Sequence, residues 1–97
     1  MELVTAEQLL DELHIDQLPD ELVTMKSLID DASALIRGSI ADDATEEELL
    51  AVSGNVFNRL VSSLASKMYY ERDLSSGYGA GIQIMLNQLR AKYLGGK

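Results

Sequence analysis

The residues that most often carry out chemistry are sparse in this sequence. His14 is the single histidine and the chain has no cysteine, so any further ligands of a metal site would have to be oxygen atoms. The acids near His14 have no metal-ligand spacing, and residues 42–46 lack the acids around a glycine that form a calcium loop. We therefore expect no metal site, and we expect His14 to face solvent at the end of a helix.

Catalysis has equally little material. A serine nucleophile would need His14 as its base, because no other histidine is present. Gly77-Tyr78-Gly79-Ala80-Gly81 superficially resembles a phosphate loop before a helix, but no strand precedes it and no GK[ST] sequence follows. Acyl carrier proteins hold their cofactor on the serine of an Asp-Ser-Leu triplet, and Ser62-Ser63-Leu64 lacks the aspartate. We expect no enzyme activity, no cofactor, and a hinge at the glycines.

Charge is unevenly distributed along the chain. Residues 1–50 contain 14 acidic and 2 basic side chains, whereas residues 51–97 contain 2 acidic and 6 basic ones, and the net charge is −8. A negative chain is unsuited to generic binding of nucleic-acid phosphates. The asymmetry would let the acidic half of one copy face the basic half of another, but charge runs more often belong to solvent.

The length of 97 residues and the apolar content of 46% fit one globular domain. A domain of this size is marginally stable by itself, and oligomerisation would raise its stability. The N-terminal sequence MELVTAEQLLDEL carries acids and no basic segment, and no stretch approaches the roughly 20 apolar residues that span a bilayer. We expect neither a signal peptide nor contact with a membrane.

Helix signals define the first half of the chain. A capping box over residues 5–8 starts a short helix that should end near His14. Pro19 starts a second helix, which should end at Arg37 because Gly38 follows. The predicted apolar stripe of this second helix is Leu22, Met25, Leu28, Ile29, Ala32, Leu35 and Ile36.

The second half predicts two more helices. A capping box over residues 45–48 starts a long central helix that should run to about Arg72, with a break or bend at Ser53-Gly54. After a flexible loop from Leu74 to Gly81, the last helix should run from Ile82 to Leu94. The central helix has a broad apolar sector and an opposite polar side of Asn55, Asn58, Arg59, Ser62 and Ser66. The last helix has a buried stripe of Ile82, Met85, Leu86, Leu89 and Tyr93. The fold class is all-α, with four helices, or five if the central one breaks.

One concentration of aromatic and charged side chains comes before the last helix, at Tyr69, Tyr70, Arg72 and Tyr78. Tyrosine and arginine are favoured at protein interfaces because they combine contact area with hydrogen bonding. Alternatively, Tyr69 belongs to the core and the others cap the helix. The residue types favour neither alternative.

Four segments, taken in order, carry a family resemblance. They are AEQLLDELHID (residues 6–16), LVTMKSLIDDASALI (22–36), SLASKMYYERD (63–73) and IMLNQLRAKY (84–93), and the pair YYERD and LNQLR carries most of the weight. The set resembles the small head–tail connector proteins of tailed phages. The chain departs from that family where residues 44–53 are longer and more acidic, and where Met68-Tyr69 replaces a frequent tryptophan.

The resemblance implies a structural protein of the virion head–tail junction, made in the cytoplasm of the host bacterium. Copies would form a ring, a dodecamer on the portal protein, that extends the DNA channel without specific DNA binding and carries the next connector, stopper or tail protein. Such a ring joins two different faces of each copy, which the charge asymmetry would suit. The predicted subunit and portal interface is Tyr69, Tyr70, Arg72, Leu74, Tyr78, Arg90 and Tyr93. The alternative is a small acidic adaptor or regulatory protein that binds a cellular protein in an exposed apolar groove.

Overall fold

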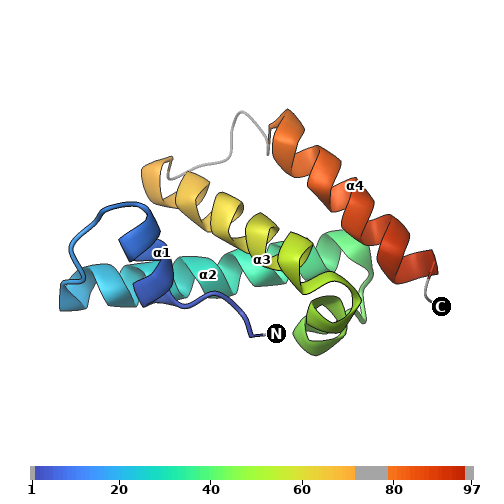
Figure 1. Cartoon of the computed structure of the whole chain (residues 1–97), viewed down its shortest axis with the longest axis horizontal. Coiled ribbons are helices and arrows are strands. Elements are labelled where there is room, and N and C mark those ends of the chain that lie inside the picture. The colour runs from blue at the N-terminus through green and yellow to red at the C-terminus, as the bar shows by residue number, and fades with distance from the viewer. Residues whose placement is uncertain (1, 72–78, 96–97) are drawn as a thin grey trace.

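The structure is a computed structural model that describes residues 2–71 and 79–95. The four helices are α1 (Ala6–Glu12), α2 (Pro19–Ile40), α3 (Glu46–Tyr70) and α4 (Ala80–Gly95). No strand occurs within the described ranges, so the predicted all-α class is confirmed. α2 and α3 form the centre, α1 packs on α2, and α4 packs on α3 and on α2 (Figure 1).

Local hydrogen bonds fix both ends of α1. Thr5 Oγ1 accepts from the N–H of Gln8 at 3.1 Å, and Gln8 Oε1 accepts from the N–H of Thr5 at 2.9 Å, which confirms the predicted capping box. At the other end the N–H groups of His14 and Ile15 donate to carbonyls of the last turn, at 3.1 and 2.9 Å. This is a Schellman motif, with exposed His14 at φ 60°, the position that glycine usually occupies.

α2 is longer than the sequence predicts. Pro19 lies in its first turn as predicted, but the helix continues through Gly38 to Ile40. Ile40 is only 7% exposed, and its burial offsets the cost of about 1 kcal/mol for a glycine inside a helix. The predicted end at Arg37 was therefore wrong.

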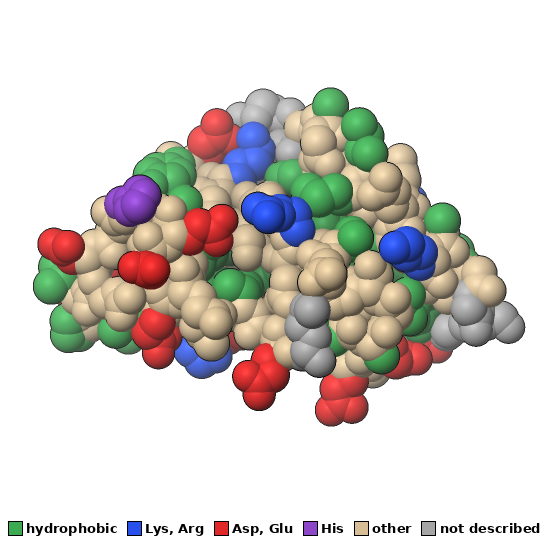
Figure 2. Space-filling view, in the orientation of Figure 1, with side chains coloured by type: hydrophobic (Ala, Val, Ile, Leu, Met, Phe, Trp, Pro, Cys, Tyr) green, Lys and Arg blue, Asp and Glu red, His purple; other side chains and the backbone are tan. Residues whose placement is uncertain are grey.

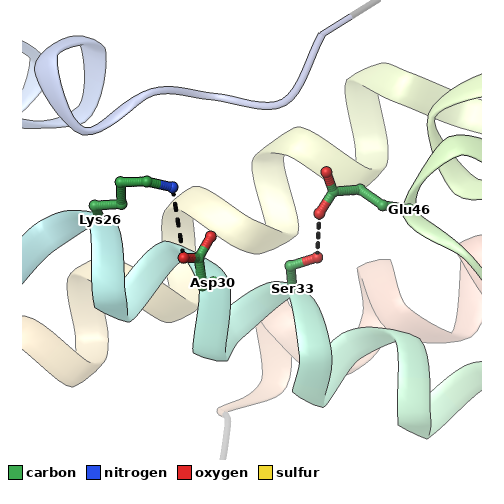
Figure 3. Close-up of polar contacts among 4 residues, drawn as sticks. All are labelled: Lys26, Asp30, Ser33 and Glu46. Atoms are coloured by element: carbon green, nitrogen blue, oxygen red, sulfur yellow. Dashed lines mark hydrogen bonds and ion pairs between the residues drawn. The ribbon is translucent and has the colours of Figure 1, made fainter.

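A buried polar contact joins α2 to the start of α3 (Figure 3). Ser33 is 1% exposed, and its Oγ donates to a carboxylate oxygen of Glu46 at 2.8 Å. Glu46 also lies in the first turn of α3, where a negative charge is favourable. The buried side of α2 is rotated toward Ser33, so Leu35, predicted to be in the stripe, is 41% exposed.

α3 begins at the second capping box and bends at the predicted point. Thr45 Oγ1 accepts from the N–H of Glu48 at 3.1 Å, and Glu48 Oε1 accepts from the N–H of Thr45 at 3.0 Å. Ser53 has non-helical angles of φ −161° and ψ 75°, and Gly54 after it is buried. The first turns of α3 therefore lie at a steep angle to the rest of the helix (Figure 1), and fully buried Leu49 lies on these first turns.

The last two boundaries differ slightly from prediction. α3 ends at Tyr70, and Arg72, its predicted end, lies outside the described residues. α4 starts at Ala80, two residues early, so Gly81 is helical rather than part of the predicted loop. Gly79 has φ 85°, and its carbonyl accepts the first backbone hydrogen bond of α4 at 3.1 Å.

One hydrophobic core lies between α2 and α3 and extends under α1 and α4. Its largest fully buried apolar side chains are Leu9, Leu10, Met25, Leu49, Phe57, Leu60, Val61, Leu64 and Leu89. In the predicted stripe of α4, Leu86, Leu89 and Tyr93 are buried, while Ile82 and Met85 are half-buried. Burial of each large side chain contributes about 1.5–3 kcal/mol, so this core is the main source of stability.

Replacing Gly38 by alanine should raise the free energy of unfolding by about 1 kcal/mol, because the added methyl group meets no atom within 4 Å and alanine is the better helix former. Gly79→Ala is the matched control. Its site is equally open, but at φ 85° an alanine is strained, so stability should fall by about 1 kcal/mol. Urea denaturation followed by circular dichroism measures both. Effects of the same sign would contradict this explanation.

Candidate interaction surfaces

The structure does not bring the predicted interface residues into one patch. Tyr69 and Tyr70 end α3 beside the start of α2, whereas Arg90 and Tyr93 lie on α4 toward the end of α2 (Figure 1). The remaining three, Arg72, Leu74 and Tyr78, lie outside the described residues.

Tyr69 and Tyr70 have different environments. The Tyr69 hydroxyl donates to the carboxylate of Glu21, which ties the end of α3 to the first turn of α2. The two rings meet edge to face, with centroids 5.1 Å apart and planes at 84°. Tyr70 is 64% exposed, so it has surface to offer a second molecule, while half-buried Tyr69 serves the fold. Their predicted interface role stays a prediction.

A groove of about 520 Å³ lies between α2 and the end of α3. Its lining includes Glu21, Thr24, Leu28, Asp31, Met68 and Tyr69. The two acids next to the apolar side chains would suit a partner that is basic and partly apolar.

Arg90 has partners within the chain. Its Nη2 donates to the carbonyl of Ser39 at 2.7 Å, and its Nη1 donates to Asn87 Oδ1 at 3.2 Å. Ser39 lies in the last turn of α2, where carbonyl groups lack helical partners and a cation is favourable. Nearby Tyr93 is 2% exposed, which confirms it as a stripe residue and leaves almost no surface for contact with another chain.

Asn58 binds the N-terminal segment. Its Oδ1 accepts from the N–H of Val4 at 2.8 Å, and its Nδ2 donates to the carbonyl of Glu2 at 2.9 Å. The sequence predicts Asn58 on an outward polar side of the helix. In the structure the segment before α1 lies over this side chain and forms hydrogen bonds with both its amide oxygen and its amide nitrogen. A hollow of about 320 Å³ lies here between the segment, α1 and α3, and Arg59 pairs with Glu12 across it at 3.9 Å.

The four most exposed large aliphatic side chains were not predicted to be functional. Leu18 and Val23, at the start of α2, are 59% and 72% exposed. Ile84 and Leu94, on the outer side of α4, are 58% and 53% exposed. Val23, Ile84 and Leu94 lie outside the apolar stripes that the sequence predicts for α2 and α4, because helical periodicity marks the buried side of a helix and not an exposed one.

Other site types find no support in the described ranges. Within residues 2–71 and 79–95, no three His, Cys, Asp or Glu side chains are grouped as metal ligands. No helix in those ranges combines the length and apolar character that crossing a bilayer requires.

No protein-family model matches the chain, and the searches of curated proteins and of solved structures give no match. The connector resemblance therefore depends on the four sequence segments.

Asn58→Ala should lower the free energy of unfolding by about 1–2 kcal/mol, because it removes two hydrogen bonds from the N-terminal segment. Asn55→Ala, an exposed amide on the same side of α3, should change stability by less than about 0.5 kcal/mol. Hydrogen exchange should show faster exchange of the Val4 amide in N58A alone. Equal effects of the two substitutions would show that the amide does not hold the segment.

Arg90→Gln should lower the stability of the monomer by about 1–2 kcal/mol, because it removes a charged donor from the end of α2. The control is Lys92→Gln, which changes an exposed cation on the same helix and should have little effect. Denaturation of the dilute protein measures both. If Arg90 acts at an interface between copies instead, R90Q would keep the stability of the monomer and lose only association.

Proposed function

We propose that this chain is a structural head–tail connector of a tailed phage or prophage. Its copies form a ring under the portal protein, extend the DNA channel and carry the next connector, stopper or tail protein. The protein acts by assembly and shape, without catalysis.

The observation that carries the proposal is the order of the connector-like segments along the helices. Residues 6–16 cover α1 and its terminating turn, 22–36 lie within α2, 63–73 include the end of α3, and 84–93 lie within α4. The resemblance thus assigns one segment to each helix in chain order. The end of α3 carries Tyr69 and Tyr70 of the YYERD motif, and α4 carries the LNQLR motif. Four of the predicted interface residues, Tyr69, Tyr70, Arg90 and Tyr93, lie on these two helices.

The distribution of charge supports assembly through two different faces. In Figure 2 most acidic side chains lie over α1 and the start of α2 and along the lower edge of the molecule, where one basic side chain also lies. The other basic side chains in this view lie over α3 and α4, with one acidic side chain beside them at the top. A ring of identical subunits needs one face to meet a different face of the next copy. Opposite charges on the two faces would select that pairing over pairing of like faces.

Mixing the chain with rings of the portal protein from the same phage or prophage should add a layer of density beneath the portal in negative-stain images. Tyr70→Ala should weaken this binding by about tenfold, because an exposed tyrosine is typical of the residues that dominate an interface. Asn55→Ala is the surface control and should bind like the wild type. Portal rings that gain no layer from excess wild-type protein would contradict the proposed function.

The groove between α2 and α3 favours the second candidate, an adaptor for a basic, partly apolar segment of a cellular protein. Charge reversal at Asp31 separates the two functions. It would abolish capture of such a segment in the groove, and a connector that does not use the groove would still stack on the portal.

A further inference from the structure

The N-terminal segment, residues 2–4, is hydrogen-bonded to one side chain. Asn58 on α3 accepts from the N–H of Val4 at 2.8 Å and donates to the carbonyl of Glu2 at 2.9 Å. Among the described residues, the segment forms no other hydrogen bond. The two bonded groups flank Leu3 and are the pair that a parallel β-strand would bind. Asn58 is therefore a site for an extended peptide backbone, and the segment of the same chain fills it.

The N-terminal segment packs loosely on two sides. Leu3 and Val4 are only half-buried against the core. One hollow of about 320 Å³ lies between the segment, α1 and α3. A second of about 320 Å³ lies between the segment and α2, at the ion pair of Lys26 with Asp30 (Figure 3). Atoms beside a hollow lack packing partners there, so the segment should detach at a lower free energy than the helices.

The start of α1 does not depend on the N-terminal segment. The Thr5 hydroxyl accepts from the N–H of Gln8, and the Gln8 side chain accepts from the N–H of Thr5. Both bonds can stay when residues 2–4 leave Asn58. Figure 1 shows the segment leading away from the start of α1. Three extended residues span about 10 Å, so a detached segment reaches a site on any molecule in direct contact.

A second copy of the chain is the occupant that fits the Asn58 site. Every copy carries the same segment and the same site, so exchange between two copies keeps both hydrogen bonds of each. Its cost is then only that of bringing the copies together, which makes exchange of an identical element a low-cost route to assembly.

We propose that in the assembled protein the N-terminal segment of each copy binds Asn58 of a neighbouring copy, in place of its own. The role of this exchange in a ring rests on the proposed function. The contact joins the start of α1 on one copy to the middle of α3 on the next. These are two different surfaces, as a ring of identical subunits requires.

Cysteine cross-linking tests the exchange, because the wild-type chain has no cysteine. Glu2→Cys marks the segment of a donor chain, and Asn55→Cys marks the site of an acceptor chain. Both side chains are exposed and line the same hollow. The two chains are mixed at about 1 mM, where even a millimolar contact is populated, and treated with a short reagent that joins two thiols. Each chain has one cysteine, so every cross-link joins two copies.

Two further substitutions make a matched pair of mixtures. Val4→Pro removes the N–H from the segment, and Asn58→Ala removes the site. The complementary mixture combines an N58A donor with a V4P acceptor, so the marked segment and the marked site are both intact. The crossed mixture combines a V4P donor with an N58A acceptor, so both are defective. The complementary mixture should cross-link about tenfold faster, because only there do the marked groups form both hydrogen bonds.

Donor and acceptor chains without these two further substitutions supply the second measurement. They should cross-link about threefold faster than the crossed mixture, because each site is also open to its own segment. Circular dichroism confirms that each variant is folded. Equal rates in the complementary and crossed mixtures would overturn the assigned site. Cross-linking of the unsubstituted pair at the crossed rate would overturn the exchange.

The outcomes separate the exchange from the function. Rapid cross-linking of the complementary and unsubstituted pairs, with no layer of protein on portal rings, would keep the exchange and reject the connector function. A layer on the portal with equal rates in all mixtures would keep the connector function and reject the exchange.

Discussion

The packing of α3 on α2 is the contact on which the rest of the structure depends. α1 has only two turns and α4 about four, and isolated helices of such lengths are marginal in water. Each becomes stable by covering one side of the layer that α2 and α3 form, with Phe57 and Met25 fully buried inside it. The bend at Ser53 serves the same layer, because it lets α3 begin with a cap at Thr45 and still lie along α2.

Polar contacts fix where the helices lie along one another. Apolar packing is non-directional and tolerates small shifts, whereas a hydrogen bond fails when its atoms separate. Glu21 and Tyr69 join one end of the α2–α3 layer, and Ser33 and Glu46 join α2 to the start of α3. Arg90 attaches α4 to the last turn of α2. Each contact joins two different helices, over sequence separations of 13, 48 and 51 residues, so together they select one register.

Local signals in the sequence predicted most of the helices. Two errors, at the end of α2 and at Asn58, arise from contacts with residues distant in sequence. The caps at Thr5 and Thr45 and the bend at Ser53 depend on a few adjacent residues, so they were readable directly. The end of α2 was misplaced because Gly38 is a local stop signal, while the burial of Ile40 is a property of the folded core. Asn58 was placed in solvent because its partners are 54 and 56 residues away.

Contacts between residues distant in sequence also explain why the sequence predicted the exposed interface residues only in part. A tyrosine or an arginine is a residue type suited to an interface. The residue type does not tell whether the side chain is buried or hydrogen-bonded within its own chain. Tyr70 remains available on the surface, whereas Tyr93 is enclosed and Arg90 is engaged within the chain. The exposed apolar side chains of α4 were not predicted, because their exposure follows from the way the opposite side of the helix packs.

The attachment of α4 has a mechanical consequence. Its C-terminal half is anchored by buried Tyr93 and by the bond from Arg90 to the end of α2, while its first turn, at Ala80 and Gly81, is exposed. A sideways load on the exposed first turn would therefore act as a torque about the anchored half of α4. If copies of the chain contacted one another through α4, a tilt of this helix would change the angle between neighbouring copies, and hence the curvature of the assembly.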